Sequence, residues 1–171
     1  MTSTRVTRRI HAPRAAVYRA LTDPAAVARW RAPVGMTCVI HQFDAREGGS
    51  SRVSLTYDAP GAAGKTTART DTYHGHFARL VPDEQVVEVL EFETSDPFLL
   101  GKMTVTTTLT DADDGTDVVI THQGLPRGVS AADNEAGTRM ALDKLAALVE
   151  PGSSSIRVSH RFSPALPVQA A

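Results

Sequence analysis

Residues 130–149 read SAADNEAGTRMALDKLAALV, the segment of this chain with the clearest pattern of a long amphipathic helix. Ser130 can cap the helix, and Asp133 places a negative charge near the positive end of the helix dipole. Small and apolar residues then recur at spacings of three and four, so they share one stripe that has to be buried: Thr138, Ala141, Leu142, Leu145, Leu148 and Val149. Pro151 and Gly152 end the helix, because neither favours its continuation.

Most of the chain before this helix alternates between apolar and polar residues, as β-strands do. The expected strands span residues 4–10, 37–44, 51–57, 68–80, 86–93, 103–109 and 118–123. Two short helices, at residues 13–21 and 25–30, interrupt the series after the first strand, because Pro13 suits a first helical turn and Asp23-Pro24 separates the two. The economical arrangement is an α+β fold in which one curved antiparallel sheet wraps around the last helix.

Length and composition indicate an ordinary globular protein of one domain. The chain has 171 residues, 42% of them hydrophobic, and a net charge of −1. This charge supplies no general field for nucleic acid or an anionic membrane, and no stretch approaches the ~20 apolar residues of a membrane span. Neither a nucleic acid nor a membrane is therefore expected as a partner. With Cys38 as the single cysteine and no apolar run after the basic N-terminal residues, the expected location is cytoplasmic.

Two loop motifs suggest ligands that their spacing does not support. The run GAAGKT at residues 61–66 ends like a phosphate-binding loop, but Ala59 stands where that loop needs its first glycine, and a strand follows rather than a helix. The aspartates around Gly115 lack the ligand alternation and closing glutamate of a calcium loop. We therefore expect a flexible hairpin loop and a solvated hairpin tip.

His74 and His76 lie two residues apart on one strand, a spacing that a metal ion could bridge with a third ligand. No third ligand has an obvious claim, so both are expected to be ordinary histidines on a polar face. Cys38 has no identifiable histidine partner and is expected to be a small buried thiol. The sequence therefore predicts neither a metal nor a cofactor.

Three polar residues occupy positions on otherwise apolar faces. Arg8 lies between Val6 and Ile10, Glu88 lies in an apolar run, and His122 follows one. A charge placed inside a sheet must be paired or solvated, since an unpaired buried charge costs several kcal/mol. A cavity between sheet and helix would solvate them. The alternative is that strand twist or a sheet edge exposes each of these side chains.

Several runs of the sequence are similar to those of one known family. They are IHAPRAAVYRALTDPAAVARW (10–30), FDAREGG (43–49), YHGHFARLVPDEQVVEVLEFE (73–93), DGTDVVITHQGLP (114–126) and ALDKLAALVE (141–150). In the same order, they resemble the family named for the activator of Hsp90 ATPase homologue, within the START/Bet v 1-like (SRPBCC) superfamily. The resemblance covers roughly residues 5–150.

This resemblance implies a helix-grip fold. Such a fold has a seven-stranded antiparallel sheet, two short helices between the first two strands, and a long C-terminal helix across the opening of a hydrophobic cavity. Residues 1–150 are accordingly expected to form one START/Bet v 1-like domain. Residues 151–171 are rich in Ser, Pro and Ala, and are expected to be a disordered tail.

The chain departs from the family pattern at three places. Relatives often carry a second tryptophan after that of the Arg-Trp pair, where this chain has Arg31. They often carry an aromatic residue after the double glycine, where this chain has Ser51, and a Gly-Trp pair early in the last helix, where this chain has Gly137 and Thr138. Smaller or more polar residues at these places are expected to enlarge or wet the cavity.

The first functional hypothesis is a binding protein for a small apolar or amphipathic molecule, held between sheet and helix. The residues expected to line the cavity and contact this ligand are Arg8, Tyr57, Phe77, Glu88, Leu90, Val105, Ile120, His122, Thr138 and Met140.

Two other hypotheses stay open. Superfamily relatives include cyclases, dehydratases and hydrolases, and in such an enzyme Glu88, Arg8 and His122 could serve as acid–base groups. The family name implies a co-chaperone role, although that activity belongs to larger, multidomain relatives. Catalytic residues, the ligand and the existence of a homodimer are not determined by the sequence.

Overall fold

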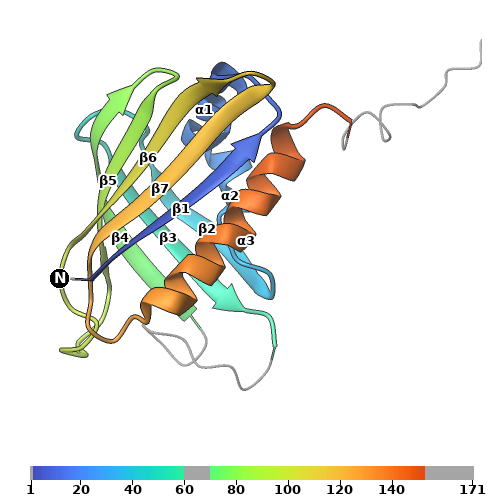
Figure 1. Cartoon of the computed structure of the whole chain (residues 1–171). Helices are drawn as coiled ribbons and strands as arrows, with labels where there is room; N and C mark the ends of the chain where they lie inside the picture. Colours follow the sequence, from blue (N-terminus) through green and yellow to red (C-terminus); the bar gives the residue numbers. More distant parts are fainter. Residues whose placement is uncertain (1, 60–69, 153–171) are drawn as a thin grey trace, which may run out of the picture.

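The computed structural model describes residues 2–59 and 70–152, which form an α+β fold (Figure 1). In chain order the elements are β1 (Thr2–Ile10), α1 (Arg14–Thr22), α2 (Pro24–Trp30), β2 (Met36–Phe43), β3 (Ser50–Tyr57), β4 (Thr70–Val81), β5 (Gln85–Phe92), β6 (Met103–Ala112), β7 (Gly115–Leu125) and α3 (Ala131–Val149). The predicted helix-grip architecture is confirmed, including the two short helices between the first two strands.

The seven strands form one antiparallel sheet in the order β1-β7-β6-β5-β4-β3-β2. β1 pairs with β7 and forms one edge of the sheet, and β2 forms the opposite edge. Figure 1 shows the sheet curving around α3, with α1 and α2 beside the helix at one end. The inner face of the sheet is therefore covered by helices, while the outer face has no helix on it among the described residues.

The sequence of α3 explains its start and its orientation. The Ser130 hydroxyl accepts a hydrogen bond from the backbone N–H of Asp133, at 3.3 Å, as expected of an N-cap. The buried stripe consists of Thr138, Ala141, Leu142, Leu145 and Ala146. The expected residues Leu148 and Val149 are only partly buried, because the last turn lies beside α1 and α2 at the edge of the core rather than over the sheet.

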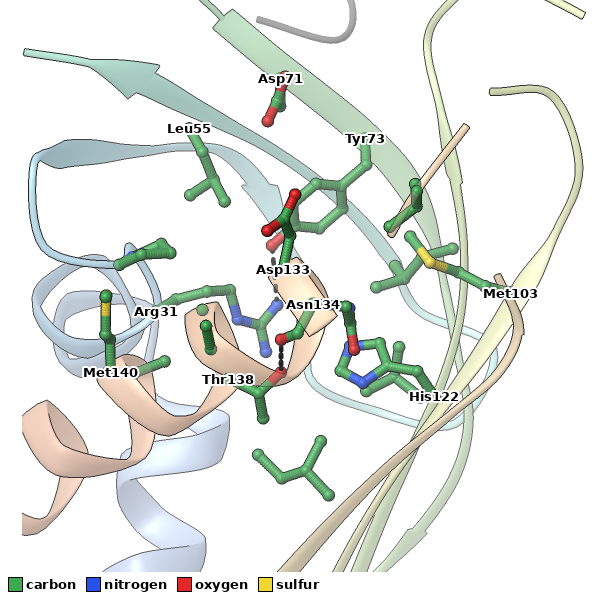
Figure 2. A pocket seen from close by; sticks show the side chains of 18 of the residues that line it. Arg31, Leu55, Asp71, Tyr73, Met103, His122, Asp133, Asn134, Thr138 and Met140 are labelled. Carbon is green, nitrogen blue, oxygen red and sulfur yellow. Dashed lines mark hydrogen bonds between the residues drawn. The ribbon is translucent and has the colours of Figure 1, made fainter. Parts of the chain in front are cut away.

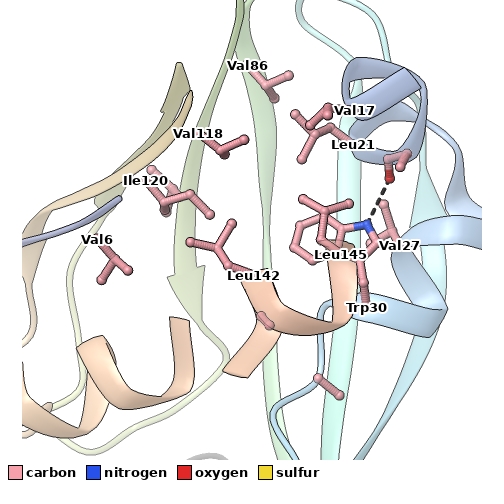
Figure 3. Close-up of a cluster of buried hydrophobic side chains, with 14 of the residues drawn as sticks. Val6, Val17, Leu21, Val27, Trp30, Val86, Val118, Ile120, Leu142 and Leu145 are labelled. Carbon is pink, nitrogen blue, oxygen red and sulfur yellow. Dashed lines mark hydrogen bonds between the residues drawn. The ribbon is translucent and has the colours of Figure 1, made fainter. Parts of the chain in front are cut away.

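A cluster of buried apolar side chains lies under the C-terminal half of α3 (Figure 3). Leu142 and Leu145 are fully buried there, together with Val118 of the sheet. The indole Nε1 of Trp30 donates a hydrogen bond of 2.8 Å to the carbonyl of Ala20, which ties α2 to α1. The two short helices and the end of α3 thus form one packed unit on the sheet.

The alternation of strand faces agrees with the predicted pattern. In β4, Tyr73 and Phe77 face the core, whereas His74 and His76 face outward. In the hairpin between β6 and β7, Gly115 pairs with Ala112, so Asp113 and Asp114 form the turn. A side chain at position 115 would collide with the carbonyl of Ile10, 2.1 Å from an added Cβ, so the close approach of β1 requires glycine.

The described residues contain no group of His, Cys, Asp or Glu side chains that could hold a metal ion. His74 instead lies between two carboxylates, with Nδ1 3.1 Å from Glu93 and Nε2 3.3 Å from Glu91. Cys38 is buried, and burial raises the pKa of its thiol, as expected for an unreactive core cysteine.

Two predictions concern segments outside the described residues: the loop containing GAAGKT at 61–66, and the tail from residue 153 onward. Of the helices in the described ranges, none has the length and apolar character needed to cross a membrane.

The packing of α3 can be tested with a matched pair of substitutions. Leu145→Ala removes a fully buried side chain and is expected to lower the free energy of unfolding by about 2–5 kcal/mol. Asp143→Ala, on the exposed side of the same helix, loses a surface ion pair with Arg8 and is expected to cost less than about 1 kcal/mol. Urea titrations measure both values, and equal stabilities would contradict this helix orientation.

Candidate functional site

A cavity of about 470 Å³ lies between the sheet and the N-terminal half of α3 (Figure 2). Its walls are mainly apolar and come from strands β3 to β7, including Leu55, Leu90, Met103, Val105, Ile120 and Leu125. The loop after α2 contributes Pro33 and Val34. The site is therefore assembled from elements that are distant in sequence.

The side chains of α3 explain why this end of the molecule is hollow. Leu142 and Leu145, in the C-terminal half, are long enough to fill the space above the sheet. The N-terminal half presents Gly137 and Thr138 toward the cavity instead. Because these side chains are short, the same helix leaves space above the sheet at one end and closes it at the other.

One wall of the cavity carries a buried network of Arg31, Glu88 and Tyr73. The Arg31 guanidinium donates to both carboxylate oxygens of Glu88, at 3.3 and 3.2 Å, and to the Tyr73 hydroxyl at 3.3 Å. The guanidinium also lies 5.3 Å from the ring centroid of Trp30. The Arg31 and Glu88 side chains are only 14% and 4% exposed, so each charge depends on the other for compensation.

The electrostatics of this network follow from burial and pairing. Burial opposes the charge on Arg31, but the nearby Glu88 and Tyr73 outweigh it and raise the pKa of the guanidinium, which stays charged. Burial is also the main reason that the pKa of Tyr73 rises to about 12. At neutral pH Arg31 is therefore a cation and Tyr73 a neutral phenol.

His122 faces the same cavity from β7. Its Nδ1 is buried and has no hydrogen-bond partner among the described residues. Burial, aided by the positive charge of Arg31, lowers the pKa of the imidazole to about 4. His122 is therefore a neutral polar group at neutral pH. Nearby on α3, the side-chain oxygen of Asn134 accepts a hydrogen bond of 2.5 Å from Thr4, the residue paired with His122.

The structure brings most of the residues named from the sequence to this cavity. Those that line it are Tyr57, Glu88, Leu90, Val105, Ile120, His122, Thr138 and Met140. Met140 is 41% exposed and lies at the mouth rather than in the interior.

Arg8 and Phe77 do not line the cavity. Arg8 faces α3 from the edge strand β1, and its Nε donates to the exposed carboxylate of Asp143 at 2.8 Å, outside the cavity. Phe77 is fully buried and packs edge-to-face on Phe43, with ring centroids 5.2 Å apart.

The three residues that depart from the family pattern lie in different parts of the structure. Thr138 and Arg31 line the cavity, but Ser51 is buried elsewhere, opposite Gly75 on β4, and so neither enlarges nor wets it. Arg31 and Tyr73 were not among the predicted site residues. The arginine at position 31, where relatives often carry a tryptophan, could have indicated the Arg31–Glu88 pair from the sequence, because a buried cation needs a carboxylate beside it.

The Arg31–Glu88 pair leads to a test by double substitution. Arg31→Met leaves the Glu88 carboxylate buried without its cation and is expected to cost about 3 kcal/mol of unfolding free energy. Adding Glu88→Leu removes the stranded charge and is expected to recover most of that loss. Chemical denaturation of the two variants measures the difference. A double variant that is no more stable than Arg31→Met would mean that the two side chains do not depend on each other.

The buried imidazole predicts a pH dependence of stability. His122 has a folded-state pKa of about 4, against an ordinary value of about 6.5, so the unfolded chain binds its proton more readily. Its contribution is fully present above pH 6.5 and is lost as the pH falls toward 4. Between pH 7 and pH 4.5 this amounts to about 2–3 kcal/mol.

His122→Gln is expected to remove this part of the pH dependence in urea titrations, whereas His76→Gln, on the exposed outer face, should retain it. Parallel profiles for the wild-type protein and the His122 variant would contradict the assignment.

Comparisons with known proteins place this chain in a family. The family model described as "Activator of Hsp90 ATPase homolog 1-like protein" matches residues 11–150. No curated protein sequence matches the chain significantly.

Among solved structures, protein CV1439 from Chromobacterium violaceum is 31% identical, with a TM-score of 0.78 over 88% of this chain and 99% of that chain. The AHSA1-like protein from Aeromonas hydrophila is 19% identical, with a TM-score of 0.67 over 93% and 96%. Protein Ms6760 from Mycobacterium smegmatis, at 16% identity and a TM-score of 0.68 over 87% and 91%, shares the fold. The chain therefore belongs to the family of activator of Hsp90 ATPase homolog 1-like proteins.

Proposed function

We propose that this protein binds a small, largely apolar molecule in the cavity between the sheet and α3. The observation that supports this most directly is the cavity itself, with about 470 Å³ of space, apolar walls and a few buried polar groups. Binding sites for small molecules commonly have volumes of about 300–1,000 Å³ and this distribution of polarity.

The mouth of the cavity supports the same proposal. Val34 and Met140 both line the cavity and are 75% and 41% exposed, respectively. Val34 belongs to the loop after α2, and Met140 to α3, so apolar side chains flank the opening from two elements. Exposed apolar residues around a concave site favour an apolar ligand over water.

Acid–base catalysis has weaker support from the same residues. The Glu88 carboxylate is engaged by Arg31 through two hydrogen bonds. His122 is neutral, and its Nδ1 is covered by the protein. Glu88 keeps lone pairs for a hydrogen bond from a ligand, but its charge is held in the ion pair with Arg31, and only one nitrogen of His122 is uncovered. These groups are therefore better suited to orienting a ligand than to transferring protons.

The ligand contacts that we propose are the cavity-lining residues already named, together with Arg31 and Tyr73. In this arrangement the apolar body of the ligand lies against Leu90, Val105 and Ile120. Its polar group is directed toward the Arg31 network. We also propose a cytoplasmic location, in line with the single, buried and reduced Cys38.

The proposal can be tested by filling the cavity. Thr138→Trp is expected to be neutral or stabilising, because an indole in open space gains apolar burial, and to weaken binding of the uncharged dye Nile red at least about fivefold. Fluorescence titration measures dye affinity, and thermal unfolding measures stability. Native mass spectrometry of freshly purified wild-type protein should also detect a bound small molecule.

Arg139→Trp is the matched control, because it adds the same indole to the neighbouring position, whose side chain is 60% exposed. This variant should bind Nile red like the wild-type protein. Marked destabilisation by Thr138→Trp with unchanged dye binding would mean that the dye binds elsewhere, and the cavity would lose its proposed role.

A further inference from the structure

We propose that the cavity selects apolar molecules whose polar group donates a hydrogen bond and carries no negative charge, such as an alcohol or an amine, and disfavours carboxylates. This inference rests on the proposed binding function and concerns the class of ligand. It follows from the charges and the hydrogen-bonding capacity of the groups that line the cavity.

The charge of the cavity wall opposes anions. Among the described lining residues, Arg31 is the one cation, and it is neutralised by the bidentate contact with Glu88. A ligand carboxylate would have to displace Glu88 or lie beside it in a largely dehydrated space. Both alternatives are unfavourable, because like charges at close range repel and a displaced carboxylate would stay buried without compensation.

Two neighbouring positive features do not change this balance. The ammonium group of Lys144 donates to the carbonyl of Ala32 at 2.8 Å, and this residue does not line the cavity. The N-terminus of α3 lies at the cavity, and its dipole would attract an anion. Its first turn, however, carries Asp133, whose carboxylate also lines the cavity and offsets that partial charge.

The hydrogen-bonding capacity favours a donor on the ligand. Each carboxylate oxygen of Glu88 accepts one hydrogen bond from Arg31 and has a further lone pair available. His122 is neutral, and because its Nδ1 is covered by the protein a ligand can contact only Nε2, which is an acceptor when the proton is on Nδ1. A ligand O–H or N–H can satisfy these acceptors. A carboxylate, which only accepts, can satisfy neither.

The experiment uses one apolar body with different polar groups. 2-Naphthalenemethanol, 2-naphthylmethylamine, 2-naphthoate and 2-methylnaphthalene are titrated against wild-type protein carrying Nile red at pH 7.5, and displacement gives each affinity. We expect the alcohol and the ammonium compound to bind at least about tenfold more tightly than naphthoate. Naphthoate binding as tightly as the alcohol would overturn the inference.

Glu88→Gln tests the source of the selection. Removing this charge frees Arg31, so naphthoate should gain at least about tenfold in affinity relative to the alcohol. The control is Glu91→Gln, which changes the net charge equally on the opposite face of the same strand, where the side chain is 36% exposed. An equal effect of both variants, or none from Glu88→Gln in a folded protein, would contradict the inference. If Glu88→Gln does not fold, the wild-type ligand series decides alone.

The outcomes separate this inference from the proposed function. If Nile red binding to the wild-type protein is unaffected by Thr138→Trp, the cavity is not the binding site and the proposed function fails. If Thr138→Trp weakens Nile red binding but the naphthalene compounds bind equally, the binding function stands and the selection is wrong. The selection is also wrong if Nile red binds in the cavity and none of the four compounds displaces it.

Discussion

The packing of the C-terminal half of α3 on the sheet is the constraint on which the rest of the structure depends. Leu142 and Leu145 are fully buried at this contact, and Lys144 adds a hydrogen bond to the backbone of the loop after α2. The C-terminal half of the helix is thus fixed by packing, whereas the N-terminal half is connected to β1 by the hydrogen bond from Thr4 to Asn134. The N-terminal half can therefore cover a large cavity without filling it, which a close-packed interior would not otherwise tolerate.

The Arg31–Glu88 pair gives this cavity one polar wall. Buried ion pairs contribute little net stability, because the cost of removing both charges from water offsets most of their attraction. The pair is therefore better explained by its effect on the contents of the cavity than by its effect on folding. It places hydrogen-bonding groups within an otherwise apolar space and leaves that space without a free cation among the described lining residues.

Most of the fold was predictable, because strand alternation and helical periodicity report directly which face is buried. The same pattern identified Glu88 and His122 as polar residues on inner faces. The pattern also selected Arg8, which does not line the cavity. It could not show that β1 is an edge strand and that Arg8 lies beside Asp143. Arg31 follows the end of α2, outside any periodic segment, and its contact with a residue 57 positions away depends on the closure of the whole fold.

Positions 31 and 138 lie on different elements but face the same cavity. Both line the cavity, and both carry smaller or more polar residues than the tryptophans to which the family resemblance points. A charged pair in the wall requires water or a hydrogen-bonding ligand beside it, since a dry apolar neighbour would leave its remaining polar atoms unsatisfied. The short side chain of Thr138 contributes part of that space. The cavity of about 470 Å³ extends beyond this position, so the Arg31–Glu88 pair has room for such a neighbour beside it.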